Sequence, residues 1–238
     1  MNTKLKLLGL GALVCASGSA YAQVVTDVLN ETFDNSDNFT TSAGFFNDGG
    51  TDYFQIGSGT EKNYTGFSGG YLEGQDLDGE GADIPITVTW SGLSITGLSD
   101  LKFSGDFAEY FDSPGDIDDA GDFMLLEYQI DGGGFVSFLA FENDGTQYNT
   151  FFYEDTDFDG TGDGAALGNA SSTFLKSLAG TGDTLDIRFS VSVDSGDEDF
   201  GVDNFIVTGV TAVPEPEFFG ALAGVLVLGL AVVRRRRA

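Results

Sequence analysis

The sequence contains no histidine, a single cysteine and only ten basic residues among 238. Without histidine, the chain has no Ser-His-Asp or Cys-His pair, no imidazole ligand for zinc and no histidine proton shuttle. The one cysteine, Cys15, lies in an apolar N-terminal segment, so the rest of the chain offers no disulfide and no zinc–thiolate site. The formal charge of −28 argues against nucleic acid as a partner, because such a binder needs a basic surface to neutralise phosphates.

Residues 1–22 are typical of a secretory signal peptide. Two lysines, Lys4 and Lys6, precede a short uncharged apolar run at 7–16, and the segment ends in the A-x-A cleavage pattern of Ala20 and Ala22. The apolar run is too short to span a membrane, which takes about 20 residues. We therefore predict that signal peptidase cleaves the chain after Ala22.

The C-terminal segment, 213–238, predicts a single short hydrophobic helix followed by a basic cluster. Residues 218–233 carry no charge and would form a helix about 24 Å long at 1.5 Å per residue. The cluster consists of Arg234, Arg235, Arg236 and Arg237. Since arginines beside a membrane span stay in the cytoplasm, residues 23–212 are expected on the far side of the inner membrane.

The tripeptide Pro214-Glu215-Pro216, the apolar segment and the arginines follow one another in order, and together they resemble the PEP-CTERM sorting signal. The resemblance covers residues 213–238 only. It implies that an exosortase-like enzyme of Gram-negative bacteria recognises the tripeptide and removes the tail in the envelope. It also implies release to the cell surface or extracellular matrix of organisms that produce extracellular polysaccharide. The alternative is a plain tail anchor with a coincidental tripeptide.

The intervening residues, 23–212, predict one acidic β-domain. Of the 38 acidic residues only Glu215 and Glu217 lie outside this segment, which leaves 36 acids beside four bases. Apolar and polar residues alternate over 185–193, 84–90, 101–107 and 123–130, as in strands with one buried face. Asp131 and the glycines at 132–134 suit a hairpin turn that leads into 135–141, and 200–207 is a last strand candidate.

Helical patterns are nearly absent from this segment. Residues 171–179 fit a short helix or a strand equally well. Many short strands with Gly/Asp turns and no βαβ rhythm predict an all-β fold, an antiparallel two-sheet sandwich of the jelly-roll kind.

The acidic loop at 155–164 is the best candidate for a metal site. Its alternating aspartates, with Gly160 permitting a sharp turn, can converge on a hard cation such as Ca²⁺ through Asp155, Asp157, Asp159 and Asp163. The start of the loop resembles the D-x-D-x-D-G of EF-hand loops, but Ala166 stands where that pattern requires a bidentate Glu. A solvated acidic turn is the alternative.

Other acidic segments, 76–80, 116–122 and 194–199, are expected to be turns between strands. Residues 30–34 and 199–209 resemble the first and last strands of extracellular carbohydrate-binding jelly rolls, in which a calcium ion often joins the two termini. This resemblance suggests Glu31 and Asp203 as a second site.

Three functions compete at this point. The first is a non-catalytic structural or adhesive protein, stabilised by calcium, within extracellular polysaccharide. The second is a carbohydrate-binding module, which requires exposed tyrosines because Trp90 is expected in the core. The third is a glycoside hydrolase with two carboxyls facing across a cleft. We expect no enzyme, since no acidic pair stands in a distinctive motif.

Overall fold

The computed structural model describes residues 22–59, 61–110, 121–146 and 150–213, and all regular structure in these ranges is β-strand. Strand β12 (Thr184–Ser192) shows how the sequence builds it. Its four apolar residues Leu185, Ile187, Phe189 and Val191 are buried on one face, as the alternating pattern predicts. The predicted all-β fold is confirmed for the described part of the chain.

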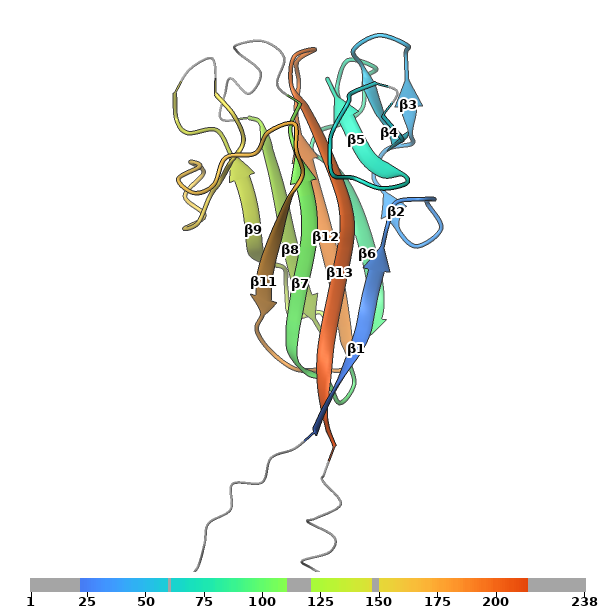
Figure 1. Cartoon of the computed structure of the whole chain (residues 1–238), viewed down its shortest axis with the longest axis vertical. Coiled ribbons are helices and arrows are strands. Elements are labelled where there is room, and N and C mark those ends of the chain that lie inside the picture. The colour runs from blue at the N-terminus through green and yellow to red at the C-terminus, as the bar shows by residue number, and fades with distance from the viewer. Residues whose placement is uncertain (1–21, 60, 111–120, 147–149, 214–238) are drawn as a thin grey trace, which may run out of the picture. The chain divides into compact units, whose positions relative to one another are not determined.

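The strands form two antiparallel sheets that pack face to face (Figure 1). The first sheet has the order β11 (Ser172–Leu178), β7 (Ser99–Ala108), β13 (Asp199–Val213), β5 (Tyr71–Gln75), β4 (Tyr53–Gly57) and β3 (Phe46–Asn47), and β1 (Ala22–Glu31) also pairs with β13. The second sheet has the order β10 (Tyr153–Glu154), β9 (Val136–Glu142), β8 (Phe123–Ile130), β12, β6 (Ile86–Ser94) and β2 (Thr40–Thr41).

Two segments singled out in the sequence, 123–130 and 171–179, contain strands. Residues 123–130 form β8, and the hairpin to β9 turns through Asp131 and Gly132, whose φ angles are +50° and +71°. The ambiguous segment 171–179 contains strand β11, which pairs along β7 from Leu178↔Leu101 to Ser172↔Phe107. Strands β4 and β5 were not predicted.

An aromatic cluster joins the two sheets at the centre of the core. Phe205 of β13 lies with its ring centroid 5.3–5.8 Å from those of five buried aromatic residues, and Trp90 and Phe189 among them belong to the opposite sheet. Gly105 makes room for this ring, since a Cβ there would lie 2.9 Å from Phe205 Cδ1. The five neighbours are Phe33, Trp90, Phe103, Phe107 and Phe189.

The chain divides into two units, of which Val25–Thr211 is the sandwich described here and the other contains both termini. Strands β1 and β13 lie side by side, so residues 25 and 211 leave the sandwich at the same end (Figure 1). Ala22 is the first residue of β1 and Val213 the last of β13. The remainder of the predicted signal peptide and sorting tail, including Ala20 and residues 214–237, lies outside the described residues.

No helix that could cross a bilayer is found among the described residues. The predicted apolar helix at 218–233 lies outside them.

Replacing Phe205 by alanine should lower the free energy of unfolding by about 3–5 kcal/mol, because the substitution removes a buried ring that contacts both sheets. Urea unfolding of the full chain in detergent measures the change. The control is Leu175→Ala, since Leu175 is 75% exposed on β11 and its truncation should cost less than about 0.5 kcal/mol. Equal losses in the two variants would contradict the central position of Phe205.

Candidate metal sites at one end of the sandwich

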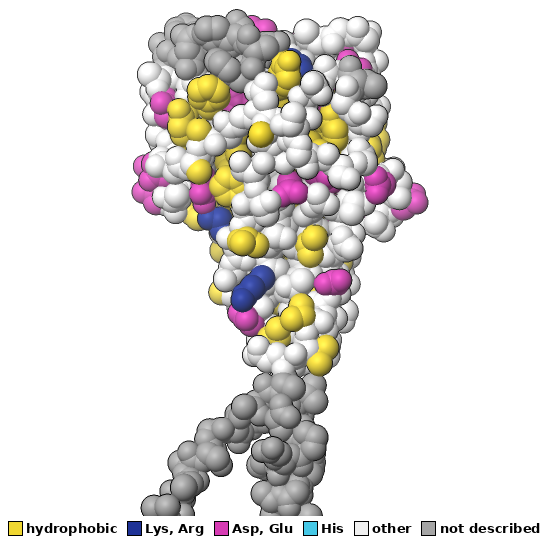
Figure 2. Space-filling view, viewed as in Figure 1, with side chains coloured by type: hydrophobic (Ala, Val, Ile, Leu, Met, Phe, Trp, Pro, Cys, Tyr) yellow, Lys and Arg dark blue, Asp and Glu magenta, His cyan; other side chains and the backbone are white. Residues whose placement is uncertain are grey.

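The end of the sandwich opposite residues 25 and 211 collects the acidic loops. Strand pairing brings them together, because Ser192 lies opposite Phe123 and Phe123 lies opposite Glu142. Strand β13 begins at this same end with Asp199 and runs to the other. On the face shown in Figure 2, acidic side chains are more numerous over this wide end than near residues 25 and 211.

The first acidic group, here the crossover cluster, consists of Asp122, Asp194 and Glu198. Asp122 directly precedes β8, whereas Asp194 and Glu198 lie in the connection by which the chain passes from β12 in one sheet to β13 in the other. One carboxylate oxygen from each lies within 4.8 Å of the others. Asp122 and Glu198 are buried and Asp194 is exposed. Burial, followed by the charge of Asp122, raises the pKa of Glu198 well above its ordinary value.

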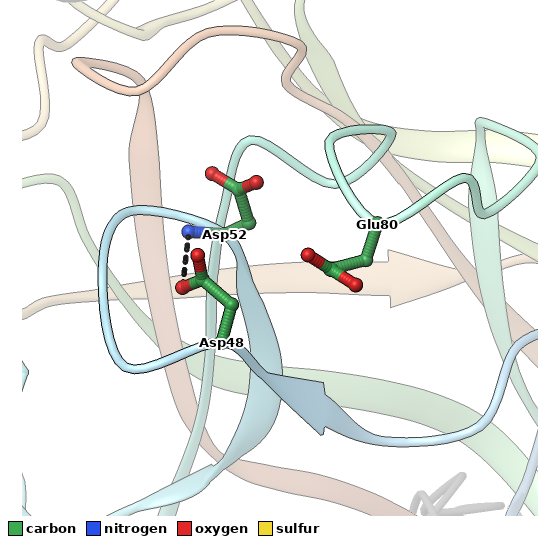
Figure 3. Close-up of side chains that lie close together, drawn as sticks. All are labelled: Asp48, Asp52 and Glu80. Carbon is green, nitrogen blue, oxygen red and sulfur yellow. Dashed lines mark hydrogen bonds between the residues drawn. The ribbon is translucent and has the colours of Figure 1, made fainter.

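The second group consists of Asp48, Asp52 and Glu80 (Figure 3). Asp48 and Asp52 flank the turn between β3 and β4, and the Asp48 carboxylate accepts hydrogen bonds from the backbone N–H of Gly50 at 2.6 Å and of Asp52 at 3.3 Å. Glu80 faces them from the loop after β5. Asp48 and Glu80 are exposed to solvent.

Asp76 adds a further carboxyl beside this second group. Its burial and the neighbouring charge of Asp52 raise its pKa to about 6. Gly79 permits the close approach, because a Cβ at that position would lie 2.4 Å from Asp52 Oδ2. Residues 76–80, predicted as a simple turn, therefore contribute to an acidic group.

The third group contains three of the four predicted calcium ligands, Asp155, Asp157 and Asp159, whose carboxylates converge within 4.8 Å. Asp155 is buried and organises the loop: its Oδ1 accepts the N–H of Phe158 at 2.7 Å and its Oδ2 accepts the N–H of Gly160 at 2.9 Å. The exposed Asp157 has a raised pKa, mainly because of the charge of Asp159.

The fourth predicted ligand, Asp163, lies outside this group of three. Its Oδ1 accepts hydrogen bonds from the backbone N–H of Thr156 at 3.0 Å and from its hydroxyl at 2.8 Å. The backbone hydrogen bond is the main reason that the pKa of Asp163 is lowered. Asp163 thus links the end of this loop to Thr156 near its start.

Glu142, at the end of β9, lies between the third group and the crossover cluster. Burial, followed by the charges of Asp155 and Asp122, raises its pKa to about 7. The acidic residues beside β8, β9 and β10 therefore interact electrostatically at one end of the second sheet.

In the part of the chain that the structure describes, no basic side chain forms an ion pair with these groups. Residues 23–212 contain four basic residues, and each pairs with an acid that belongs to none of the three clusters. The pairs are Lys62–Asp199, Lys102–Asp100, Lys176–Glu154 and Arg188–Glu127. Within residues 23–212, no further basic residue supplies counter-charge for the clusters, so protons or cations of the solvent are the remaining source there. Oxygen-rich groups of this kind can bind a metal ion.

The second predicted site, Glu31 with Asp203, is not among the groups of converging acids in the described residues. Glu31 is buried, and its two oxygens accept hydrogen bonds from the backbone N–H of Phe33 at 2.8 Å and from Trp90 Nε1 at 3.3 Å. Asp203 instead accepts a hydrogen bond from the backbone N–H of Asn204 at 2.7 Å. Each acid thus has a structural role in the fold.

Tyrosines were the candidate sugar-stacking residues, and the structure places several of them in a buried layer on the outer face of the first sheet. Tyr53, Tyr64 and Tyr71 are buried, Tyr110 and Tyr153 are half-buried, and Tyr148 lies outside the described residues. Trp90 is in the core, as expected. Among the described residues, no tyrosine is exposed as a stacking platform requires.

Asp199 and Glu73 are buried in the same layer, and no pattern in the sequence predicted the burial of either residue. Asp199 accepts the Tyr64 hydroxyl at 2.7 Å and pairs with Lys62 at 3.1 Å. Glu73 accepts Gln55 Nε2 at 2.9 Å, and a Cβ at Gly57 would overlap its carboxylate. Burial, with a smaller contribution from Glu61, raises the pKa of Glu73 to about 7.

No family model and no curated protein matches the sequence. Solved structures with a similar arrangement include the CBM22-1 xylan-binding domain of Xyn10C from Paenibacillus barcinonensis, with 12% identity, a TM-score of 0.38, and coverage of 81% of this chain and 99% of that one. The K3 cleaved adhesin domain of Lys-gingipain from Porphyromonas gingivalis has 14% identity, a TM-score of 0.41, and coverage of 78% and 99%.

A cyclase from Fischerella sp. TAU is similar to the same extent, with 10% identity, a TM-score of 0.43, and coverage of 82% of this chain and 100% of that one. At these identities and TM-scores the likeness is coarse, and it does not distinguish a binding domain from an enzyme.

The raised pKa of Glu73 predicts a pH-dependent stability. Between pH 4.5 and about 7 the unfolded chain has released the Glu73 proton while the folded chain still holds it, so rising pH favours unfolding. Glu73→Gln should therefore raise the thermal midpoint at pH 8 relative to wild type and change it much less at pH 4.5.

Calorimetric scans of both chains from pH 4.5 to pH 8 measure this difference. The control is Asp27→Asn, which removes one exposed charge from β1. A pH profile of Glu73→Gln parallel to that of wild type would show that Glu73 does not titrate in this range.

Proposed function

We propose that the chain is an exported, non-catalytic protein of the cell surface or extracellular matrix, with a structural or adhesive role in extracellular polysaccharide. Calcium stabilises its sandwich, and the aspartates Asp155, Asp157, Asp159 and Asp163 are ligands or supports of one such ion. Its processing partners are signal peptidase and an exosortase-like enzyme, and it passes through the inner membrane by residues 218–233.

One observation carries this proposal: three groups of carboxylates converge at one end of the sandwich, and every basic residue of 23–212 is paired elsewhere. Such a surface repels itself unless cations are available. An extracellular medium that contains calcium supplies them, whereas the cytosol keeps free calcium low. The acidic end is therefore suited to an exported protein.

Export itself is supported by the sequence at the two ends. Signal-peptide features at 1–22 and the ordered PEP-CTERM-like features at 213–238 agree on one route. A non-catalytic role is supported by the lack of histidine and by the absence of any nucleophile motif.

A glycan array tests the structural role against that of a carbohydrate-binding module. The full chain in detergent should bind weakly and without strong preference, because its described tyrosines are buried or half-buried and offer no stacking platform. The array is read with calcium and again with EDTA. Strong binding to one oligosaccharide would contradict the structural role and support the carbohydrate-binding module.

Sorting is tested by Glu215→Gln, which changes the central residue of the tripeptide. We expect this variant to remain uncleaved in the membrane fraction, while the matched variant Glu217→Gln, just outside the tripeptide, is released like wild type. Fractionation of cells, followed by mass determination of the released chain, measures both. Normal release of Glu215→Gln would show that no exosortase-like enzyme reads this tripeptide.

A further inference from the structure

The crossover cluster differs from the other two acidic groups in its place between the sheets. Asp122 precedes β8 of the second sheet, and Glu198 precedes β13 of the first. Both are buried, with exposed fractions of 0% and 1%. Their oxygens, together with one of Asp194, lie within 4.8 Å of one another. A ligand bound here would contact both sheets at the point where the chain crosses between them.

Only one of the two oxygens of the Glu198 carboxylate accepts a hydrogen bond from the described residues. Its Oε2 accepts the backbone N–H of Asp194 at 2.9 Å. Its Oε1 is fully buried and accepts no hydrogen bond from the described residues. A buried carboxylate oxygen without a donor costs free energy that an ordinary fold avoids. The four basic residues of 23–212 are paired elsewhere, so none of them supplies the missing charge.

A proton or a cation can neutralise such a group, and three carboxylates favour the cation. One proton shared by Asp122 and Glu198 would compensate a single negative charge of this buried pair and leave the other buried charge without compensation. A divalent cation compensates two charges and accepts oxygens at about 2.3–2.6 Å from several directions. Asp194 is exposed, so a cation bound here could exchange with solvent and take water as a further ligand.

We propose that Asp122, Asp194 and Glu198 bind one divalent, oxygen-preferring cation of the calcium class, which joins the start of β8 to the β12–β13 connection. This site is distinct from the loop at 155–163. The choice of calcium rests on the proposed function, which places the chain outside the cell; the choice of residues does not.

Thermal unfolding of the full chain in detergent tests the site, with Ca²⁺ alone as the probe after dialysis against EDTA. At a calcium concentration about 100 times Kd, the wild-type midpoint should rise by roughly 5–10 °C, because the ion binds only the folded state. In Glu198→Gln and Asp194→Asn the rise should fall to less than half of this. In EDTA, Glu198→Gln should be at least as stable as wild type, since it removes a buried negative charge.

The matched control is Asp27→Asn, an exposed acid of β1 that belongs to none of the three acidic groups, and it should keep the full calcium-dependent rise. Titration calorimetry should show one calcium site fewer in Glu198→Gln than in wild type. Asp194 is exposed, so Asp194→Asn should fold even if substitution of a buried acid does not.

The outcomes separate this site from the proposed function. A calcium-dependent rise that survives in both crossover variants and is lost in Asp157→Asn, a variant of the third group, would overturn the site while leaving calcium stabilisation intact. No rise in wild type would overturn both. A midpoint of wild type that responds to pH and not to calcium would identify the cluster as carboxyls that share protons, and would overturn the site.

Discussion

Contact between the two inner faces of the sandwich is the interaction on which the rest of the structure depends. The 36 acids of 23–212 favour an expanded chain, so apolar burial must hold the sheets together against that repulsion. Phe205 lies at the centre of this contact, among aromatic rings from β6, β7 and β12. Because aromatic rings fill the interior, the acids are confined to outer faces and to strand ends.

This confinement explains why acidic groups gather where strands end. Along a strand, the alternation of apolar and polar residues points each charged side chain toward solvent. Loops lack this alternation, so charged side chains from different loops can lie close together. Asp122, Glu142 and Glu198 lie at or next to strand termini, where Asp122 and Glu198 are buried and Glu142 is half-buried. Their burial raises the pKa of Glu142 and Glu198, so the stability of this end is expected to depend on pH.

The sequence predicted those parts of the fold that local pattern determines. Alternation identified β8 and β12 because each has one buried and one partly solvated face. Strand β5 was missed because all five of its residues are buried: Tyr71 and Glu73 lie on the outer face but beneath the loop that contains Tyr64. Asp155, Asp157 and Asp159 could be grouped from spacing, since one short loop carries them. Asp122 and Asp194 are far apart in sequence, and only the pairing of β8 with β12 brings them together.

The chain enters and leaves the sandwich at one end of the domain, near residues 25 and 211. Strand β13 begins beside Glu198 and continues to Val213, and β1 lies along it, so both connections to the rest of the chain leave from one end. A strand rises about 3.3 Å per residue, which separates the acidic end from Thr211 by most of the length of β13. Any attachment beyond Thr211 therefore joins the sandwich at the end away from the acidic clusters. In the proposed function, cation binding at the clusters and removal of a C-terminal tail use different residues, so neither event would require the other.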